Sequence, residues 1–167
     1  MDAEHLLIRF LHDAGGAAWF GASVFANVVL LPFVMRQPVD RQRDLVSGLL
    51  RTPERFIIVA ALLAATTGLA RGLWSGRIDS VDDLTTTWGA TWLAAIVVTL
   101  FVFAVGGRVT SPAMSALIQD DALWAMNGTA QAHEARARTF GRMRLGFRLE
   151  LVGLSVILSL MVVLAAN

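Results

Sequence analysis

The chain has 167 residues, of which 56% are hydrophobic and 16% charged, and its formal net charge is +1. A soluble domain carries about 25% charged residues, so this composition indicates a membrane protein. The sequence has no cysteine and no lysine. These absences exclude disulfides, thiolate metal sites, cysteine nucleophiles, Schiff-base lysines and a P-loop lysine.

Four apolar segments follow one another, and two of them, residues 14–35 and 84–107, contain no charged residue. A helix needs about 20 residues to cross the hydrocarbon core of a bilayer. We therefore predict an all-α integral membrane four-helix bundle that forms one transmembrane domain over residues 1–167. The acidic start and the long first apolar run are unlike a signal peptide. The predicted spans cover residues 8–35, 55–73, 84–107 and 145–166.

Arginine is unevenly distributed between the predicted connections. Five arginines lie in or beside the first connection and six in the third connection and the start of the last helix. The second connection holds only two, beside three aspartates. Because positively charged connections stay in the cytoplasm, we predict cytoplasmic loops over residues 36–54 and 108–144 and both termini outside. This topology describes a multi-pass protein of the inner (plasma) membrane.

Prolines and capping residues predict the helix boundaries. Pro38 is expected to break the first helix, and Ser80 or Asp82 to cap the third. The pair Thr52–Pro53 is expected to start the second helix, with a cap followed by a proline in the first turn.

An amphipathic cytoplasmic helix is expected between the third and fourth spans, opened by Ser111–Pro112 and ended by Asn127–Gly128. From Thr129 a further helix is expected to run into the last span. Its arginines suit anionic lipids at the cytoplasmic face better than a protein partner, and no nucleic acid partner is expected. The apolar face of the amphipathic helix consists of Met114, Leu117, Ile118, Leu123 and Trp124.

A stripe of polar and small residues lies on one face of the first predicted helix, because its members are three or four residues apart. Polar groups in a span are costly and usually face the protein interior, so the stripe is a candidate site. The stripe consists of His5, Arg9, His12, Gly16, Trp19, Ser23 and Asn27.

We take five of these as ligand-binding candidates: His5, Arg9, His12, Trp19 and Asn27. His12 is the candidate metal ligand, for haem b or copper. His5 lies about 10 Å from it along the helix axis, too far to share one ion. A second ligand would come from another helix, from a second subunit of a homodimer, from methionine or from water. The alternative is a histidine hydrogen-bonded near the outer surface, beside an Arg9–Asp13 ion pair.

A second cluster of charge lies where the last span begins. Arg144 and Arg148 are one helical turn apart, and Glu150 follows them. We interpret the three residues as an interfacial charge cluster. The alternative is the cytoplasmic mouth of a pathway through the bundle.

The run from Leu11 to Gly21, with Trp19 seven residues after His12 and Gly21 two after that, resembles the first-helix motif of copper-resistance-D-like membrane proteins. Haem-pathway proteins of the HemJ type have a similar spacing. This resemblance implies that the bundle holds haem or copper at His12. The stretch from Thr87 resembles a conserved stretch of the same copper-resistance family, with Ala95 in place of its lysine.

The segment 32–36 resembles the small four-helix family that includes transmembrane protein 205. That family has a phenylalanine-led pattern before its last helix, and the segment from Phe140 is similar in spacing. Arg144, Phe147 and Glu150 stand there where His, Ser and Asn are usual.

Two functions remain open from the sequence. The first is binding or transport of a ligand such as haem or copper through the outer half of the bundle. The second is a non-catalytic accessory or assembly subunit of a larger membrane complex. An enzyme is less favoured, because the sequence contains no catalytic triad, no phosphate loop and no carboxylate pair within a span.

Overall fold

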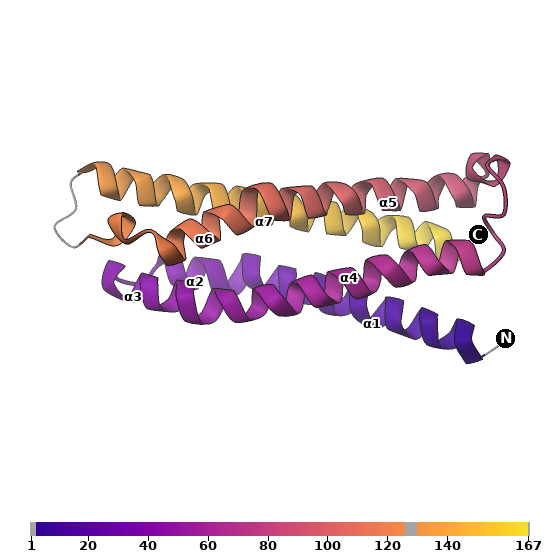
Figure 1. Cartoon of the computed structure of the whole chain (residues 1–167), viewed down its shortest axis with the longest axis horizontal. Coiled ribbons are helices and arrows are strands. Elements are labelled where there is room, and N and C mark those ends of the chain that lie inside the picture. The colour runs from indigo at the N-terminus through magenta and orange to yellow at the C-terminus, as the bar shows by residue number, and fades with distance from the viewer. Residues whose placement is uncertain (1–2, 126–129, 167) are drawn as a thin grey trace.

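The computed structural model describes residues 3–125 and 130–166, which form four long helical segments in an up-and-down arrangement (Figure 1). All four are long and apolar enough to cross a membrane. The first consists of α1 (Ala3–Phe25), η1 (Ala26–Leu30) and α2 (Leu31–Met35), and the second of α3 (Val39–Leu45), η2 (Val46–Leu50) and α4 (Arg51–Trp74). The third consists of α5 (Thr87–Val105), η4 (Gly106–Thr110) and α6 (Ser111–Gln119), and the fourth is α7 (Ala130–Ala166).

The helices pack as two pairs, α1 with α4 and α5 with α7. Both termini lie at one end of the bundle, together with the connection between α4 and α5 (Figure 1). We call this the terminal end. The opposite end contains α2, α3, α6 and the start of α7. We call it the arginine-rich end, because most of the arginines lie in or next to these segments.

Three of the four prolines lie inside long helices, each just after a π-helical turn. Pro32, Pro53 and Pro112 follow η1, η2 and η4. Proline lacks an N–H and its ring meets the carbonyl of the preceding turn, and a wider π turn lets a helix continue past it. The sequence predicted that Pro112 opens a separate helix. This prediction is wrong, because α6 continues α5 through η4 without a break. The expected connection over 36–54 is likewise mostly helix.

Pro38 does interrupt the helix, as predicted. Its backbone has φ −55° and ψ 150°, and α3 begins at the next residue. The cap of α5 differs from the prediction. Thr86, rather than Ser80 or Asp82, precedes this helix, and its hydroxyl oxygen accepts a hydrogen bond from the amide of Gly89 at 3.0 Å.

Close contact between α1 and α4 depends on small residues. A Cβ atom on Gly15 would lie 3.1 Å from the amide nitrogen of Ala64 and 3.2 Å from the carbonyl oxygen of Ala60. On the other pair, a Cβ atom on Gly146 or Gly153 of α7 would overlap a side chain of the third segment. Small residues allow helix backbones to approach closely where lipid offers little hydrophobic drive between helices.

The long helices expose many large apolar side chains along their length. The exposed fraction is 66% for Phe10, 66% for Val59 and 64% for Val162. Monomeric soluble proteins rarely expose apolar patches of this extent. The surface of the bundle therefore suits contact with lipid.

The arginine-rich end has a packed core of its own. Leu117 and Met143 are fully buried there, and the indole of Trp124 donates a hydrogen bond to the carbonyl of Leu117 at 2.8 Å. Arg136 is also buried and donates to the carbonyl of Leu123, in the short helix η5 (Asp121–Trp124). The apolar face predicted for residues 111–124 thus packs onto α7. The predicted stop at Asn127–Gly128 lies outside the described residues.

Candidate functional site

His12 of α1 faces α4 in the terminal half of the bundle. Its Nδ1 lies 2.8 Å from the carbonyl oxygen of Ala64. Because a carbonyl only accepts hydrogen bonds, Nδ1 carries the proton, and in the neutral imidazole the lone pair is then on Nε2. Gly68, one turn further along α4, makes room for the ring, since a Cβ atom there would lie 2.9 Å from its Cε1.

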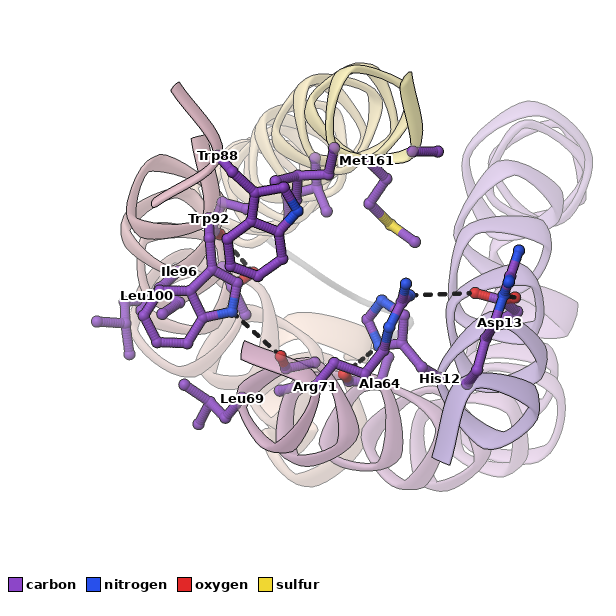
Figure 2. A pocket seen from close by; sticks show the side chains of 18 of the residues that line it. His12, Asp13, Ala64, Leu69, Arg71, Trp88, Trp92, Ile96, Leu100 and Met161 are labelled. Atoms are coloured by element: carbon purple, nitrogen blue, oxygen red, sulfur yellow. Dashed lines mark hydrogen bonds and ion pairs between the residues drawn. The ribbon is translucent and has the colours of Figure 1, made fainter. Parts of the chain in front are cut away.

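His12 lines a cavity of about 360 Å³ between the two helix pairs. We call this the His12 cavity. Figure 2 shows His12 of α1 and Met161 of α7 extending into it from different helices. The walls are mostly aromatic and aliphatic, which is typical of sites for small organic ligands. The apolar wall residues include Leu69, Trp88, Trp92, Ile96, Leu100 and Ile157.

A group of charges lies at one edge of the His12 cavity. Asp13 forms an ion pair with Arg9 at 3.8 Å, as the sequence predicted, and a second with Arg71 of α4 at 3.7 Å. All three residues line the cavity, and their side chains are exposed. Two arginines against one carboxylate leave this edge with a net positive charge, which favours an anionic or electron-rich group on a ligand.

Trp92 of α5 joins the two helix pairs beside this cavity. Its indole nitrogen donates a hydrogen bond to the carbonyl of Gly68 at 3.2 Å. Its ring lies over Gly72, where a Cβ atom would overlap it. Trp92 also stacks on Trp88, with ring centroids 6.4 Å apart. This wall of the cavity is therefore fixed by two glycines on α4.

Trp19 lies deeper along α1 and does not line the His12 cavity. It is buried and stacks on Phe103 of α5, with ring centroids 5.6 Å apart. Phe103 lines the His12 cavity, and both rings line a second cavity of about 260 Å³ closer to the arginine-rich end. We call this the Glu150 cavity. The stacked pair therefore lies between the two cavities.

The other stripe residues lie apart from these rings. His5 is exposed, and its Nε2 lies 3.3 Å from the carbonyl oxygen of Trp74 at the terminal end. Asn27 lies in the π turn η1, and its amide donates to the carbonyls of Ser23 and Phe147 at 3.0 Å each. Asn27 thus ties α1 to α7. Of the five ligand-binding candidates, only Arg9 and His12 share the His12 cavity.

The structure does not bring the three residues of the predicted charge cluster together. Glu150 is buried and accepts a hydrogen bond from the hydroxyl of Thr110, whereas Arg144 and Arg148 are exposed. Residues two and six positions away on a helix lie on other faces. The carboxylate therefore points into the bundle and the two arginines point out.

His12 and Met161 bring one nitrogen donor and one sulfur donor to the His12 cavity. Both donors are of kinds that bind copper or haem iron. His12 Nε2 has no hydrogen-bond partner among the described residues, and Met161 supplies a thioether. Imidazole and thioether ligands suit copper(I) and haem iron. Residues 3–125 and 130–166 contain no group of three histidines, aspartates or glutamates that could hold an ion such as zinc.

Several residues of both cavities were not singled out from the sequence. Met161, Trp92 and Glu54 lie on helices other than α1, and nothing in their local pattern separates them from packing residues. Only the glycine under His12, Gly68, offered a partial signal. Ala64 and Gly68 form a small-xxx-small pair, which predicts close approach of another helix without naming what approaches.

No protein-family model matches this chain, and no curated protein or solved structure is significantly similar to it. The resemblance to copper-resistance-D-like and transmembrane-protein-205-like proteins stays an expectation from the sequence.

Proposed function

We propose that this chain is a multi-pass protein of the inner (plasma) membrane, with both termini outside and the arginine-rich end in the cytoplasm. Four apolar helical segments and their exposed apolar side chains support the membrane location. The concentration of arginine at one end supports the orientation. Exposed arginines such as Arg144 and Arg148 would lie near the anionic headgroups of the cytoplasmic leaflet.

The proposed function is binding of a compact, mainly apolar ligand in the His12 cavity. One observation carries this proposal: His12 has its Nδ1 fixed by Ala64 and presents its other nitrogen to a cavity whose walls are aromatic and aliphatic. His12 Nε2 would accept a hydrogen bond from the ligand or coordinate it. Arg9 and Arg71 would attract an electron-rich group at the charged edge.

A copper(I) ion is a second candidate occupant, because Met161 lines the same cavity as His12. This thioether would be the second ligand, beside the imidazole of His12 on α1. Copper would supply a soft metal centre for transfer to another protein or across the bundle.

Haem is a weaker fit than copper. The cavity volume of about 360 Å³ lies near the lower end of the range of roughly 300–1,000 Å³ for organic ligands, which favours a compact ligand over a whole porphyrin. His12 and Met161 are the residues that would hold the iron if a haem did bind. Their role would then be to hold the iron between α1 and α7.

The test is to purify the protein in a mild detergent and identify what remains bound. Native mass spectrometry, metal analysis and an absorption spectrum are measured on the wild type, His12→Asn and Met161→Leu. His5→Asn is the matched control, because it makes the same change at an exposed histidine outside the cavity. We expect the wild type and the control to retain the ligand and His12→Asn to lose it.

The same measurements separate the candidate functions. Copper that depends on both His12 and Met161 supports the metal site, whereas an organic ligand that survives Met161→Leu supports the apolar one. Equal retention in the wild type and His12→Asn would overturn both. A preparation without ligand or metal that carries a stoichiometric protein partner would favour an accessory or assembly subunit instead.

A further inference from the structure

The Glu150 cavity lies between the stacked rings of Trp19 and Phe103 and the core of the arginine-rich end. Its volume is about 260 Å³, and residues of α1, α4, α5, α6 and α7 line it. Most of the lining is apolar. The polar side chains are two carboxylates and two hydroxyls: Glu54, Thr110, Ser111 and Glu150.

The two hydroxyls belong to consecutive residues, and each donates a hydrogen bond to one of the carboxylates. Thr110 donates to Glu150 of α7, and Ser111 donates to Glu54 of α4 at 2.9 Å. Residues next to each other on an α-helix differ by about 100° in direction. Here the side chains of Thr110 and Ser111 both reach the Glu150 cavity, at the point where the π turn η4 ends and α6 begins. π turns occur often at functional sites.

The glycines around the hydroxyl pair keep this arrangement open. A Cβ atom on Gly146 of α7 would overlap the hydroxyl of Thr110, so only glycine lets Thr110 reach Glu150. Gly106 and Gly107 also line the cavity. A Cβ atom on Gly106 would lie 3.6 Å from a carboxylate oxygen of Glu150, so the backbone of η4 is directly beside this group.

Neither carboxylate has a positive partner among the described residues. The ion pairs there involve Asp13, Asp121 and Glu134 as acids. Glu150 is only 9% exposed, and a single neutral hydroxyl is its hydrogen-bond donor. A carboxylate can accept about four hydrogen bonds, and a buried one without a counter-charge is costly. When it is ionised, Glu150 therefore lacks a counter-charge among the residues that the structure describes.

The walls indicate which kind of cation would fit. Trp19, Phe103 and Phe147 supply aromatic surfaces, and Met114 a thioether. Aromatic faces attract ammonium-type cations, and apolar walls favour a cation that carries hydrocarbon groups. Walls of this kind favour such a cation over a small hydrated metal ion, which gains little from aromatic and aliphatic surfaces.

We propose that the Glu150 cavity binds a lipophilic organic cation, such as a quaternary or protonated amine, with Glu150 as its main counter-ion and Glu54 as the second. The cationic centre would lie between the two carboxylates, and its hydrocarbon groups would contact Trp19, Phe103 and Phe147. This site is distinct from the His12 cavity, with which it shares only the ring of Phe103, and its charged residues do not line that cavity.

The experiment measures binding of phenyltrimethylammonium, a compact quaternary amine, to the purified protein in a mild detergent by calorimetry. We expect Glu150→Gln to weaken binding by roughly thirtyfold or more, because it removes a buried counter-charge. Glu54→Gln should weaken it less, since Glu54 is only half-buried. Glu134→Gln is the matched control, because it removes an exposed carboxylate from the same helix and should leave binding unchanged.

Three further measurements keep the test decisive. Tert-butylbenzene, a neutral probe of the same shape, should bind far more weakly than the cation to the wild type, which checks the role of charge without any variant. Glu150→Asp, which keeps the charge, should restore part of the binding. His12→Asn should bind the cation normally. Absent wild-type binding, equal binding of the neutral probe, or unchanged affinity in Glu150→Gln would each overturn the proposal.

Discussion

The Nδ1 atom of His12 lies 2.8 Å from the carbonyl oxygen of Ala64 on the facing helix. This contact joins α1 to α4 and also fixes which ring nitrogen is available to the cavity. The two roles can be separated, because asparagine places an N–H close to the position of Nδ1 and has no counterpart of Nε2.

His12→Ala should lower the free energy of unfolding by about 1 kcal/mol or more, since one interhelical hydrogen bond is lost. His12→Asn should retain most of this stability while losing the ligand. Unfolding by sodium dodecyl sulfate in mixed micelles measures the first effect. If His12→Asn is as destabilised as His12→Ala, the assignment of the proton to Nδ1 is wrong.

Gly72→Ala should destabilise the bundle by about 1–3 kcal/mol, because the new methyl group would overlap the indole of Trp92. Gly16→Ala on α1 is the matched control, since no atom lies within 4 Å of the added Cβ there. Alanine at that position should be neutral or stabilising, as is usual for alanine in a helix. Thermal unfolding followed by tryptophan fluorescence distinguishes the two, and equal midpoints would contradict the contact.

Met143→Ala should cost about 2–5 kcal/mol, because Met143 is fully buried in the core of the arginine-rich end. Leu145→Ala, two residues further along α7, removes a side chain that is 55% exposed and should cost far less in detergent. Chemical unfolding monitored by circular dichroism provides the measurement. A small effect at Met143 would mean that this core is loosely packed.

Asp83, in the connection between α4 and α5, predicts a pH effect outside the spans. The hydroxyl and amide of Ser80, with the amide of Asp79, hold the pKa of Asp83 below its usual value. Its contribution to stability is therefore fully present above the ordinary aspartate pKa and is lost as the pH falls through the lowered value.

The local readout is hydrogen exchange of the Ser80 amide. Protection should fall in the wild type as the pH drops below the ordinary aspartate range. In Asp83→Asn the protection should be weaker at neutral pH and independent of pH in that range. An unchanged exchange profile in Asp83→Asn would show that the turn is held by other contacts.

The four helices could be predicted from the sequence because runs of apolar residues report on burial or lipid contact directly. The effect of the prolines could not. Pro38 ends a helix while Pro112 continues one, and the difference is the π turn before Pro112, which depends on packing against α7. Local sequence gives no measure of that packing.

The candidate site was predicted only at His12. Its partner Ala64 is 52 residues away, and Thr110 is 40 residues from Glu150. Such pairs depend on the rotation of each helix about its axis, and several rotations bury similar apolar residues. The Arg144, Arg148 and Glu150 grouping followed from closeness in sequence, whereas helical geometry directs Glu150 inward and the arginines outward.

The packing of the bundle as two helix pairs has a mechanical consequence. Close glycine contacts hold α1 to α4 at Gly15 and α5 to α7 at Gly153, so each pair would move as one rigid body. The His12 cavity lies between these bodies, and Trp92 on Gly72 joins them beside it. The hydrogen bond from Asn27 to Phe147 joins the pairs on the other side, towards the arginine-rich end. A relative movement of the pairs at the terminal end would change the volume of the cavity while both pairs stay intact. The volume of the cavity would therefore depend on how the two pairs are placed against each other and not on the packing within either pair.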